Sequence, residues 1–160
     1  MMHFISTTIR QASFADLELI VPLFDAYRQF YRKESDLALA RRFLRERFDR
    51  NESTIFVAFG HDGTAIGFTQ LFPSFSSGSA APILILNDLF VVPVARHTGI
   101  GRQLLRAAAT FGQTMGAIRL TLSTEVGNSA ARALYEAEGW LLQTDYCVYN
   151  LALTPKSECG

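Results

Sequence analysis

The sequence predicts a mixed α/β fold in which about four helices cover a central sheet of six or seven strands. Three observations support this prediction. Segments with the two-residue period of strands alternate with segments of helical period along the chain. A glycine-containing junction, Arg96–Gly101, joins the longest apolar β-prone segment to an amphipathic one. The 160 residues, 49% of them hydrophobic, are enough for one domain with a full core, so we expect residues 1–160 to form a single domain.

The first half of the chain predicts a strand, two helices and a hairpin. The expected elements are a strand over 7–11, helices over 13–31 and 35–51, strands over 54–59 and 65–72, and a loop over 73–81. Ser13 with Asp16 has the pattern of a capping box at a helix start. Asp62-Gly63 lies between two strand-like segments and indicates a hairpin turn. Serine and glycine are frequent in 73–81, which favours a loop there.

The second half predicts a further strand and helix, repeated, and then a closing pair of strands. The expected elements are a strand over 83–92, a helix over 99–115, a strand over 117–124, a helix over 129–137, and strands over 140–143 and 146–153. Asn87 and Asp88 interrupt the apolar strand 83–92. Polar side chains inside a central strand are costly unless they have partners or a function. Both residues are therefore candidates for a functional site.

The junction Arg96-His97-Thr98-Gly99-Ile100-Gly101 has the properties of a pyrophosphate-binding turn. Glycine allows a tight turn and a close approach of the backbone to a ligand, and the N-terminus of the following helix attracts an anion. A dinucleotide fingerprint would need glycine or alanine at Leu104, and a Walker loop would need lysine at Arg102, so both are excluded. A turn with glycines for conformational reasons only remains the alternative.

A second cluster lies downstream of the strand predicted over 117–124. It consists of Asn128, Ala131, Leu134, Tyr135, Glu136, Gly139 and Trp140. Together with the junction, this cluster resembles the signatures of the GNAT superfamily of N-acetyltransferases: Arg/Gln-x-x-Gly-x-Gly/Ala, then Asn-x-x-Ala-x-x-Leu-Tyr-Glu-x-x-Gly-aromatic. The resemblance is continuous from about Ile83 to Trp140, whereas before Ile83 it is carried by the order of elements.

The resemblance implies a binding site for acetyl-CoA as co-substrate. In that superfamily the strands corresponding to 83–92 and 117–124 splay apart, and the pantetheine arm lies between them. The residues implied in coenzyme binding are Leu89, Phe90, Val91, Arg96, His97, Thr98, Gly99, Ile100, Gly101, Arg102 and Asn128. Tyr135 matches the general acid that protonates the leaving thiolate. Asn128 could also cap a helix, Arg102 could be solvated, and Tyr135 could pack the helix against the sheet.

Transfer of an acetyl group to an amine also requires a neutral nucleophile. An alkyl amine with a pKa of about 10.4 is mostly protonated at pH 7, a handicap of about 4–5 kcal/mol, so a base is expected. The segment around Asp88 resembles the diamine and polyamine acetyltransferase branch, in which a Glu-Asp pair occupies this place. Here Asn87 replaces the glutamate, and the base must be Asp88, Glu125 or water. Asp88 could instead be a strand acid satisfied by neighbouring donors.

We expect Tyr27, Tyr31, Asn87 and Glu125 to line the amine site, because aromatic and acidic groups suit a cationic acceptor. The leading hypothesis is an N-acetyltransferase that transfers acetyl to a primary amine of a small molecule within a ternary complex. A protein or peptide acceptor is one alternative. A catalytically idle acyl-CoA-binding module is another, and the missing acid at position 87 favours it weakly. The helical spacing of the tyrosines is equally compatible with core packing.

Composition restricts the other possibilities. The net charge of zero gives no basic field for nucleic acid, and no apolar run is long enough to span a membrane. Three scattered histidines predict no metal site, and two cysteines favour a reducing, cytoplasmic location. The family resemblance implies a homodimer that uses the C-terminal strands.

Overall fold

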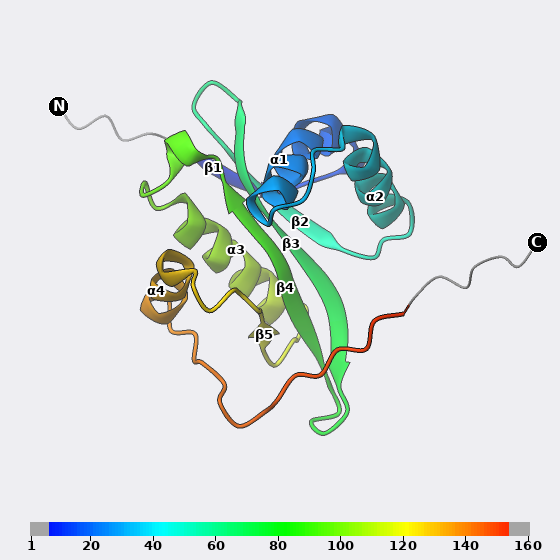
Figure 1. Cartoon of the computed structure of the whole chain (residues 1–160), viewed down its shortest axis with the longest axis vertical. Helices are drawn as coiled ribbons and strands as arrows, with labels where there is room; N and C mark the ends of the chain where they lie inside the picture. The colour runs from blue at the N-terminus through cyan, green and yellow to red at the C-terminus, as the bar shows by residue number, and fades with distance from the viewer. Residues whose placement is uncertain (1–6, 154–160) are drawn as a thin grey trace, which may run out of the picture.

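The computed structural model of the protein describes residues 7–153. It contains a five-stranded sheet and four α-helices (Figure 1). The elements in chain order are β1 (Thr8–Gln11), α1 (Leu17–Phe30), α2 (Leu37–Asp49), β2 (Thr54–Phe59), β3 (Ala65–Ser76), β4 (Ala81–Val91), α3 (Ile100–Thr114), β5 (Leu120–Thr121) and α4 (Ser129–Ala137). Two short 3-10 helices, Phe14–Asp16 and Pro93–Ala95, precede α1 and α3. The mixed α/β class and the four helices predicted from the sequence are confirmed.

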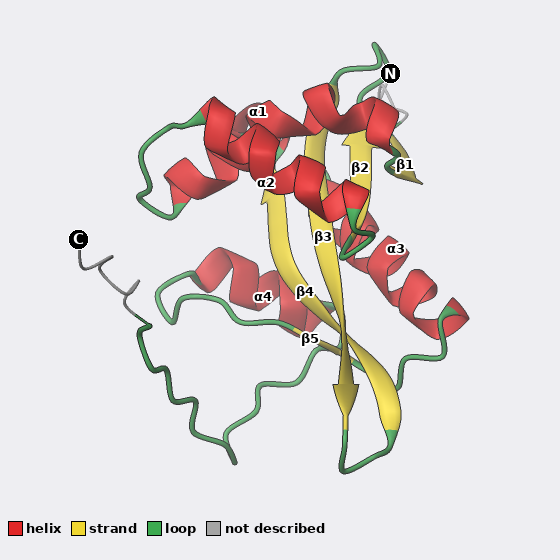
Figure 2. Cartoon of the chain, turned by 90° about the vertical axis from the view of Figure 1, so that its right-hand side faces the viewer, coloured by secondary structure: helices red, strands yellow, loops and turns green. Residues whose placement is uncertain are grey.

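The sheet has the strand order β1-β2-β3-β4-β5. Strands β1 to β4 pair antiparallel, and β5 pairs parallel with β4 after the crossover through α3. One core cluster joins α1 and α2 to one face of the sheet, around Ile20, Leu44 and Phe68. A second joins α3 and α4 to the opposite face, around Leu71 and Leu105. The helix pairs therefore form separate layers on either side of the strands (Figure 2).

The loop predicted over 73–81 is wrong. Strand β3 continues to Ser76 and β4 begins at Ala81, with Pro73 opposite Leu84 and Ser76 opposite Ala81. Only residues 77–80 form the turn of this long hairpin. The serines and glycine suggested a loop, but regular pairing with the apolar residues of β4 satisfies the backbone and overrides the local preference.

The strands predicted at the C-terminal end are also wrong in extent. The strand expected over 117–124 is reduced to Leu120–Thr121, and residues 140–153 form no strand, so residues 7–153 contain five strands instead of six or seven. In Figure 2 this C-terminal segment lies apart from the strands of the sheet. Its large apolar side chains are exposed: Leu141, Leu142, Tyr146, Val148, Tyr149, Leu151 and Leu153. A strand needs a neighbour for its backbone hydrogen bonds, and this segment has none within residues 7–153.

A β-bulge in β4 sets the position of the candidate site. Gln70 of β3 lies opposite Asp88, whereas the next residue, Leu71, lies opposite Leu86, so Asn87 is the extra residue. Such bulges bend a strand and redirect its side chains. On its other edge, β4 pairs with β5 only at Leu84 and Ile85. Beyond the bulge that edge of β4 is therefore free of a neighbouring strand in the described chain.

Candidate functional site

The bulge of β4 and the C-terminal half of α1 bring together four of the predicted acceptor-side residues. Asn87 is exposed at the bulge, whereas the adjacent Asp88 is only 2% exposed. The Tyr27 hydroxyl donates a hydrogen bond of 3.3 Å to the Asn87 carbonyl oxygen. The rings of Tyr27 and Tyr31 pack edge to face, with centroids 5.1 Å apart. These residues lie in one cluster, although Tyr27 and Asn87 are 60 residues apart in sequence.

The Asp88 carboxylate is held by neutral donors. The Gln70 side chain donates to Oδ2, and the Asn87 amide donates to Oδ1 at 3.0 Å. Burial raises the pKa of Asp88 above its usual value, and bonds from Gln70, Tyr27 and Asn87 partly oppose that rise. A carboxyl group with a raised pKa is a stronger base than an exposed aspartate. No arginine neutralises it among the described residues, so it differs from an ordinary strand acid in an ion pair.

Tyr135 lies on α4, on the opposite side of the open β4 edge from α1. It is half-buried and packs against the cluster around Leu71 and Leu105, with its ring centroid 6.1 Å from that of Trp140. Burial raises the pKa of Tyr135 to about 12, with a further contribution from Tyr31. The phenol therefore remains protonated at neutral pH. It can donate a proton or a hydrogen bond, as a general acid requires.

The junction predicted to bind pyrophosphate forms the turn into α3. His97 and Gly99 both have left-handed backbones, with φ of 62° and 88°. A Cβ at Gly99 would meet no atom within 4 Å, so the space beside this residue is open. The Thr98 hydroxyl closes the turn by donating to the Ala95 carbonyl at 2.6 Å. Ile100 is buried and anchors the helix, whose first backbone N–H groups are left for an anion.

The arginines of this region have partners within the protein. Arg96 Nε donates to the Val91 carbonyl at 2.9 Å, and its guanidinium lies 5.6 Å from the rings of Phe30 and Phe90. Arg102 lies 2.6 Å from Glu138 at the end of α4, and that carboxylate also binds Arg106. Both side chains therefore serve to hold the turn against β4 and α4. Gly101 packs at the same contact, since a Cβ there would lie 3.1 Å from Leu134.

The remaining coenzyme-side residues lie at the edges of the same opening. Leu89 and Val91 point toward the α3 side of the sheet, whereas Phe90 packs with the α1 core. Asn128 is the N-cap of α4, and its side chain accepts from the Ala131 N–H at 3.3 Å. The capping role expected for Asn128 is thus confirmed. Its contact with a coenzyme stays a prediction.

Glu125 is not free, because it forms an ion pair of 2.6 Å with Arg32. Arg32 follows α1 and has a left-handed backbone with φ of 61°. The pair connects the α1–α2 loop to the loop before α4. The α1–α2 loop is itself held by the buried Asp25, which accepts from the Ser35 hydroxyl at 2.6 Å and the Asp36 N–H at 2.8 Å.

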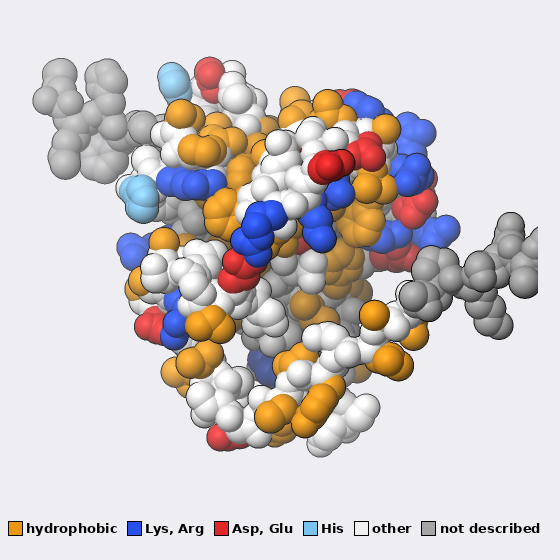
Figure 3. All heavy atoms as spheres, viewed as in Figure 1, with side chains coloured by type: hydrophobic (Ala, Val, Ile, Leu, Met, Phe, Trp, Pro, Cys, Tyr) orange, Lys and Arg blue, Asp and Glu red, His pale blue; other side chains and the backbone are white. Residues whose placement is uncertain are grey.

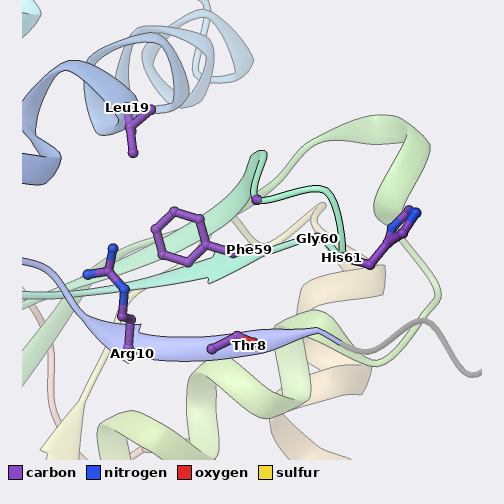
Figure 4. A pocket seen from close by; sticks show the side chains of 7 residues that line it. Thr8, Arg10, Leu19, Phe59, Gly60 and His61 are labelled. Atoms are coloured by element: carbon purple, nitrogen blue, oxygen red, sulfur yellow. The ribbon is translucent and has the colours of Figure 1, made fainter.

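Other surface features lie apart from this cluster. A shallow hollow of about 560 Å³ is formed between β1, the start of α1 and the β2–β3 turn, and is lined by Arg10, Leu19, Phe59 and His61 (Figure 4). Within residues 7–153, no three histidine, cysteine or acidic side chains gather as metal ligands. None of the described helices is long and apolar enough to cross a membrane. Cytoplasmic location stays a prediction.

Comparison with known proteins decides the family. A model of the acetyltransferase (GNAT) family matches residues 20–140, three quarters of the chain. The chain belongs to the GNAT family of acetyltransferases. An N-acetyltransferase of Bacillus subtilis named YhfO, described as uncharacterized, is 49% identical over 92% of this chain and 99% of its own. The crystal structure of a probable acetyltransferase superposes with a TM-score of 0.87 at 36% identity, over 93% of this chain and 99% of that one.

A partial likeness extends to a GNAT enzyme with a described substrate. The aminoglycoside N(6')-acetyltransferase type 1 of Klebsiella aerogenes is 29% identical over 55% of this chain and 59% of its own. The protein is thus an N-acetyltransferase, and acetyl-CoA is the co-substrate of its family. The open β4 edge and the unobstructed turn at Gly99 fit such a co-substrate.

Several residues at the site were not found from the sequence. Gln70 and the half-buried Ser53 form a polar chain to Asp88, and Arg32 pairs with Glu125. Gln70 is detectable in the sequence, since it is a polar residue inside a strand that is otherwise largely apolar. Ser53 and Arg32 are not, because their partners are set by tertiary contacts.

Proposed function

We propose that this GNAT enzyme acetylates a primary amine of a small cationic molecule by direct transfer within a ternary complex. The single observation that carries the proposal is the placement of Asp88 and Tyr135 on the two sides of the open β4 edge. One is a buried carboxylate with a raised pKa, and the other is a phenol that stays protonated. An amine acetyltransferase needs a base and an acid at two such positions.

The acceptor ammonium loses one proton to the Asp88 carboxylate, through a water or the Tyr27 hydroxyl, and becomes a neutral amine. The amine nitrogen attacks the acetyl carbonyl carbon, and the C–S bond breaks. The amine nitrogen releases its second proton to solvent, while Tyr135 protonates the departing thiolate and is reprotonated from solvent. Asp88 then releases its proton to solvent, so the net products are the acetamide, free coenzyme and one proton.

A cationic acceptor is supported by the groups around the bulge. Tyr27 and Tyr31 present aromatic rings, and Asn87 presents an amide in place of a second acid. Aromatic faces and a buried carboxylate favour an ammonium group. Relatives that acetylate aminoglycosides extend the candidate acceptors beyond diamines and polyamines to amino sugars. Because Glu125 is already paired with Arg32, it contributes to the acceptor site only if that pair opens.

We also propose a homodimer formed through residues 141–153. The support is the run of exposed apolar side chains in this segment, which Figure 3 shows as hydrophobic surface along the lower edge of the molecule. Each leucine, valine or tyrosine withdrawn from water would stabilise the assembly by about 1.5–3 kcal/mol before the cost of association.

The experiment that tests the function is thiol release from acetyl-CoA in the presence of polyamines, aminoglycosides, amino acids and short peptides. Release that depends on a polyamine or an amino sugar supports the proposal and identifies the acceptor class. Release only with peptides would move the assignment to a protein acetyltransferase. Calorimetric binding of acetyl-CoA without turnover on any amine would favour an acyl-CoA-binding module instead.

A further inference from the structure

A chain of polar side chains leads from the half-buried Ser53, at the end of the α2–β2 loop, through Gln70 to the buried Asp88. The Ser53 hydroxyl donates to Gln70 Oε1 at 2.8 Å, and Gln70 Nε2 donates to Asp88 Oδ2. Gln70 and Asp88 face each other across β3 and β4, immediately beside the bulge. Gln70 is completely buried, as are its strand neighbours Thr69 and Leu71 and the nearby Phe68. The chain thus crosses the hydrophobic interior to reach the acceptor site.

Burial of the Gln70 amide is costly for the core, and its hydrogen bonds require one orientation of the amide. An amide buried among apolar side chains is unfavourable unless its hydrogen bonds are satisfied, and an apolar residue of similar volume would pack as well. Because an ionised carboxylate only accepts hydrogen bonds, the amide nitrogen of Gln70 faces Asp88, and the amide oxygen accepts from the Ser53 hydroxyl. A donor directed at a carboxylate binds its ionised form more strongly than its neutral form.

The other groups around the carboxylate do not supply a charge. In the described chain it is faced by Tyr27 from α1, Gln70 from β3 and its own neighbour Asn87 in β4, all uncharged at neutral pH. Burial favours the protonated acid, which could not accept a proton from the substrate. The donors must therefore offset burial, and Gln70 is the only one of the three whose side chain is fully buried.

We propose that Gln70 is a positioning residue of the acceptor site, which keeps the Asp88 carboxylate ionised and holds its Oδ1 toward Asn87 and the bulge. The inference rests on the proposed function, because it takes Asp88 as the base. Gln70 touches neither substrate, and it acts only through Asp88. Ser53 satisfies the amide oxygen of Gln70.

The test is the pH dependence of kcat/KM in Gln70→Met, which keeps the length of the side chain and removes the donor. Loss of the donor raises the pKa of Asp88, so the base is protonated up to a higher pH. We expect the acidic limb of the pH profile of kcat/KM to move to higher pH by about one unit, as loss of a hydrogen bond to a charged group implies. The same shift should appear when the Asp88 carboxyl is titrated by carbon-13 NMR. Its signal is assigned as the one that is missing from the spectrum of Asp88→Asn.

Thr69→Val is the matched control. Thr69 is the neighbour of Gln70, is equally buried, and donates to the Asp88 backbone carbonyl at 2.8 Å instead of the carboxylate. The Thr69→Val variant should have a lower melting temperature and an unmoved acidic limb. An unmoved limb in Gln70→Met, or an equal shift in Thr69→Val, would reduce Gln70 to a structural role and overturn the inference.

Two further variants separate this inference from the proposed function. Asp88→Asn should abolish the enzyme's acidic limb, and a limb unchanged in that variant would refute Asp88 as the base. If that limb is lost in Asp88→Asn but is unmoved in Gln70→Met, the function stands and only the role of Gln70 fails. Should Gln70→Met not fold, Gln70→Glu preserves the shape; its acid shares a proton with Asp88, and the limb should again move to higher pH.

Discussion

Single residues at the site owe their properties to what surrounds them. Asp88 and Asp16 are both buried aspartates, but their pKa values are shifted in opposite directions. Asp88 has only neutral partners, and burial raises its pKa, whereas the hydrogen bonds from Arg10 lower the pKa of Asp16 to about 2. The first is suited to accept a proton, and the second stays ionised and stabilises the fold.

Tyr135→Phe tests the acid at the residue scale. Because the pKa of Tyr135 is raised to about 12, its hydroxyl stays protonated over the pH range in which the enzyme can be assayed. We expect kcat to fall by about 10²-fold, by a ratio that is constant between pH 6 and 10, with acetyl-CoA affinity unchanged in calorimetry. A ratio that disappears above pH 8 would contradict a donor with so high a pKa.

Gly99→Glu tests the pyrophosphate turn. The residue has a left-handed backbone and open space beside it, so a glutamate would add strain and place a negative charge at the turn. Affinity for acetyl-CoA should fall by at least about tenfold. Gly63→Glu is the control, because Gly63 has φ of 79° and equally open space in the distant β2–β3 turn. The two variants should lose similar stability, and equal affinities would refute the phosphate assignment.

At the scale of elements, short polar links hold the helices in the register that the site needs. Asp16 accepts from the Ser13 N–H at 2.8 Å and pairs with Arg10 of β1, which ties the start of α1 to the sheet edge. At the other end of the molecule, Glu138 binds Arg102 and Arg106 and joins α4 to α3. These links fix the directions of α1 and α4, the helices that carry Tyr27 and Tyr135.

The link between β1 and α1 predicts a pH-dependent stability. The folded pKa of Asp16, about 2, is below its ordinary value of 3.8, so its contribution is complete above about pH 4 and is lost as the pH falls toward 2. Asp16→Asn should lower the free energy of unfolding by roughly 1–2 kcal/mol at pH 7, after allowance for the solvent exposure of Arg10. Denaturant unfolding should give a smaller difference at pH 2.5, and a constant difference would contradict the linkage.

At the scale of the whole molecule, strands β1 to β4 form an antiparallel platform with local bulges, and β5 adds only two paired residues. Because β5 is so short, most of the β4 edge is open, and the proposed coenzyme and acceptor sides of the site both border this opening. Residues 141–153 form no strand in the described structure.

The homodimer is tested at this scale. Light scattering at micromolar concentration should give twice the mass of the chain, and deletion of residues 141–160 should give a monomer. A monomeric full-length chain would refute the proposal, whereas a dimer that survives the deletion would place the interface elsewhere.

The sequence by itself determined the fold class, the four helices and the turn before α3, because hydrophobic period, caps and glycine requirements are local properties. It also indicated Asp88 and Tyr135 as candidates through two motifs. It misplaced the loop at 73–81 and the strands after Ala117, since pairing with a neighbouring strand, and not the local composition, decides whether such segments become sheet. Only the tertiary structure placed Gln70 against Asp88 and Arg32 against Glu125, because contacts across 18 and 93 residues depend on register and packing that no local pattern encodes.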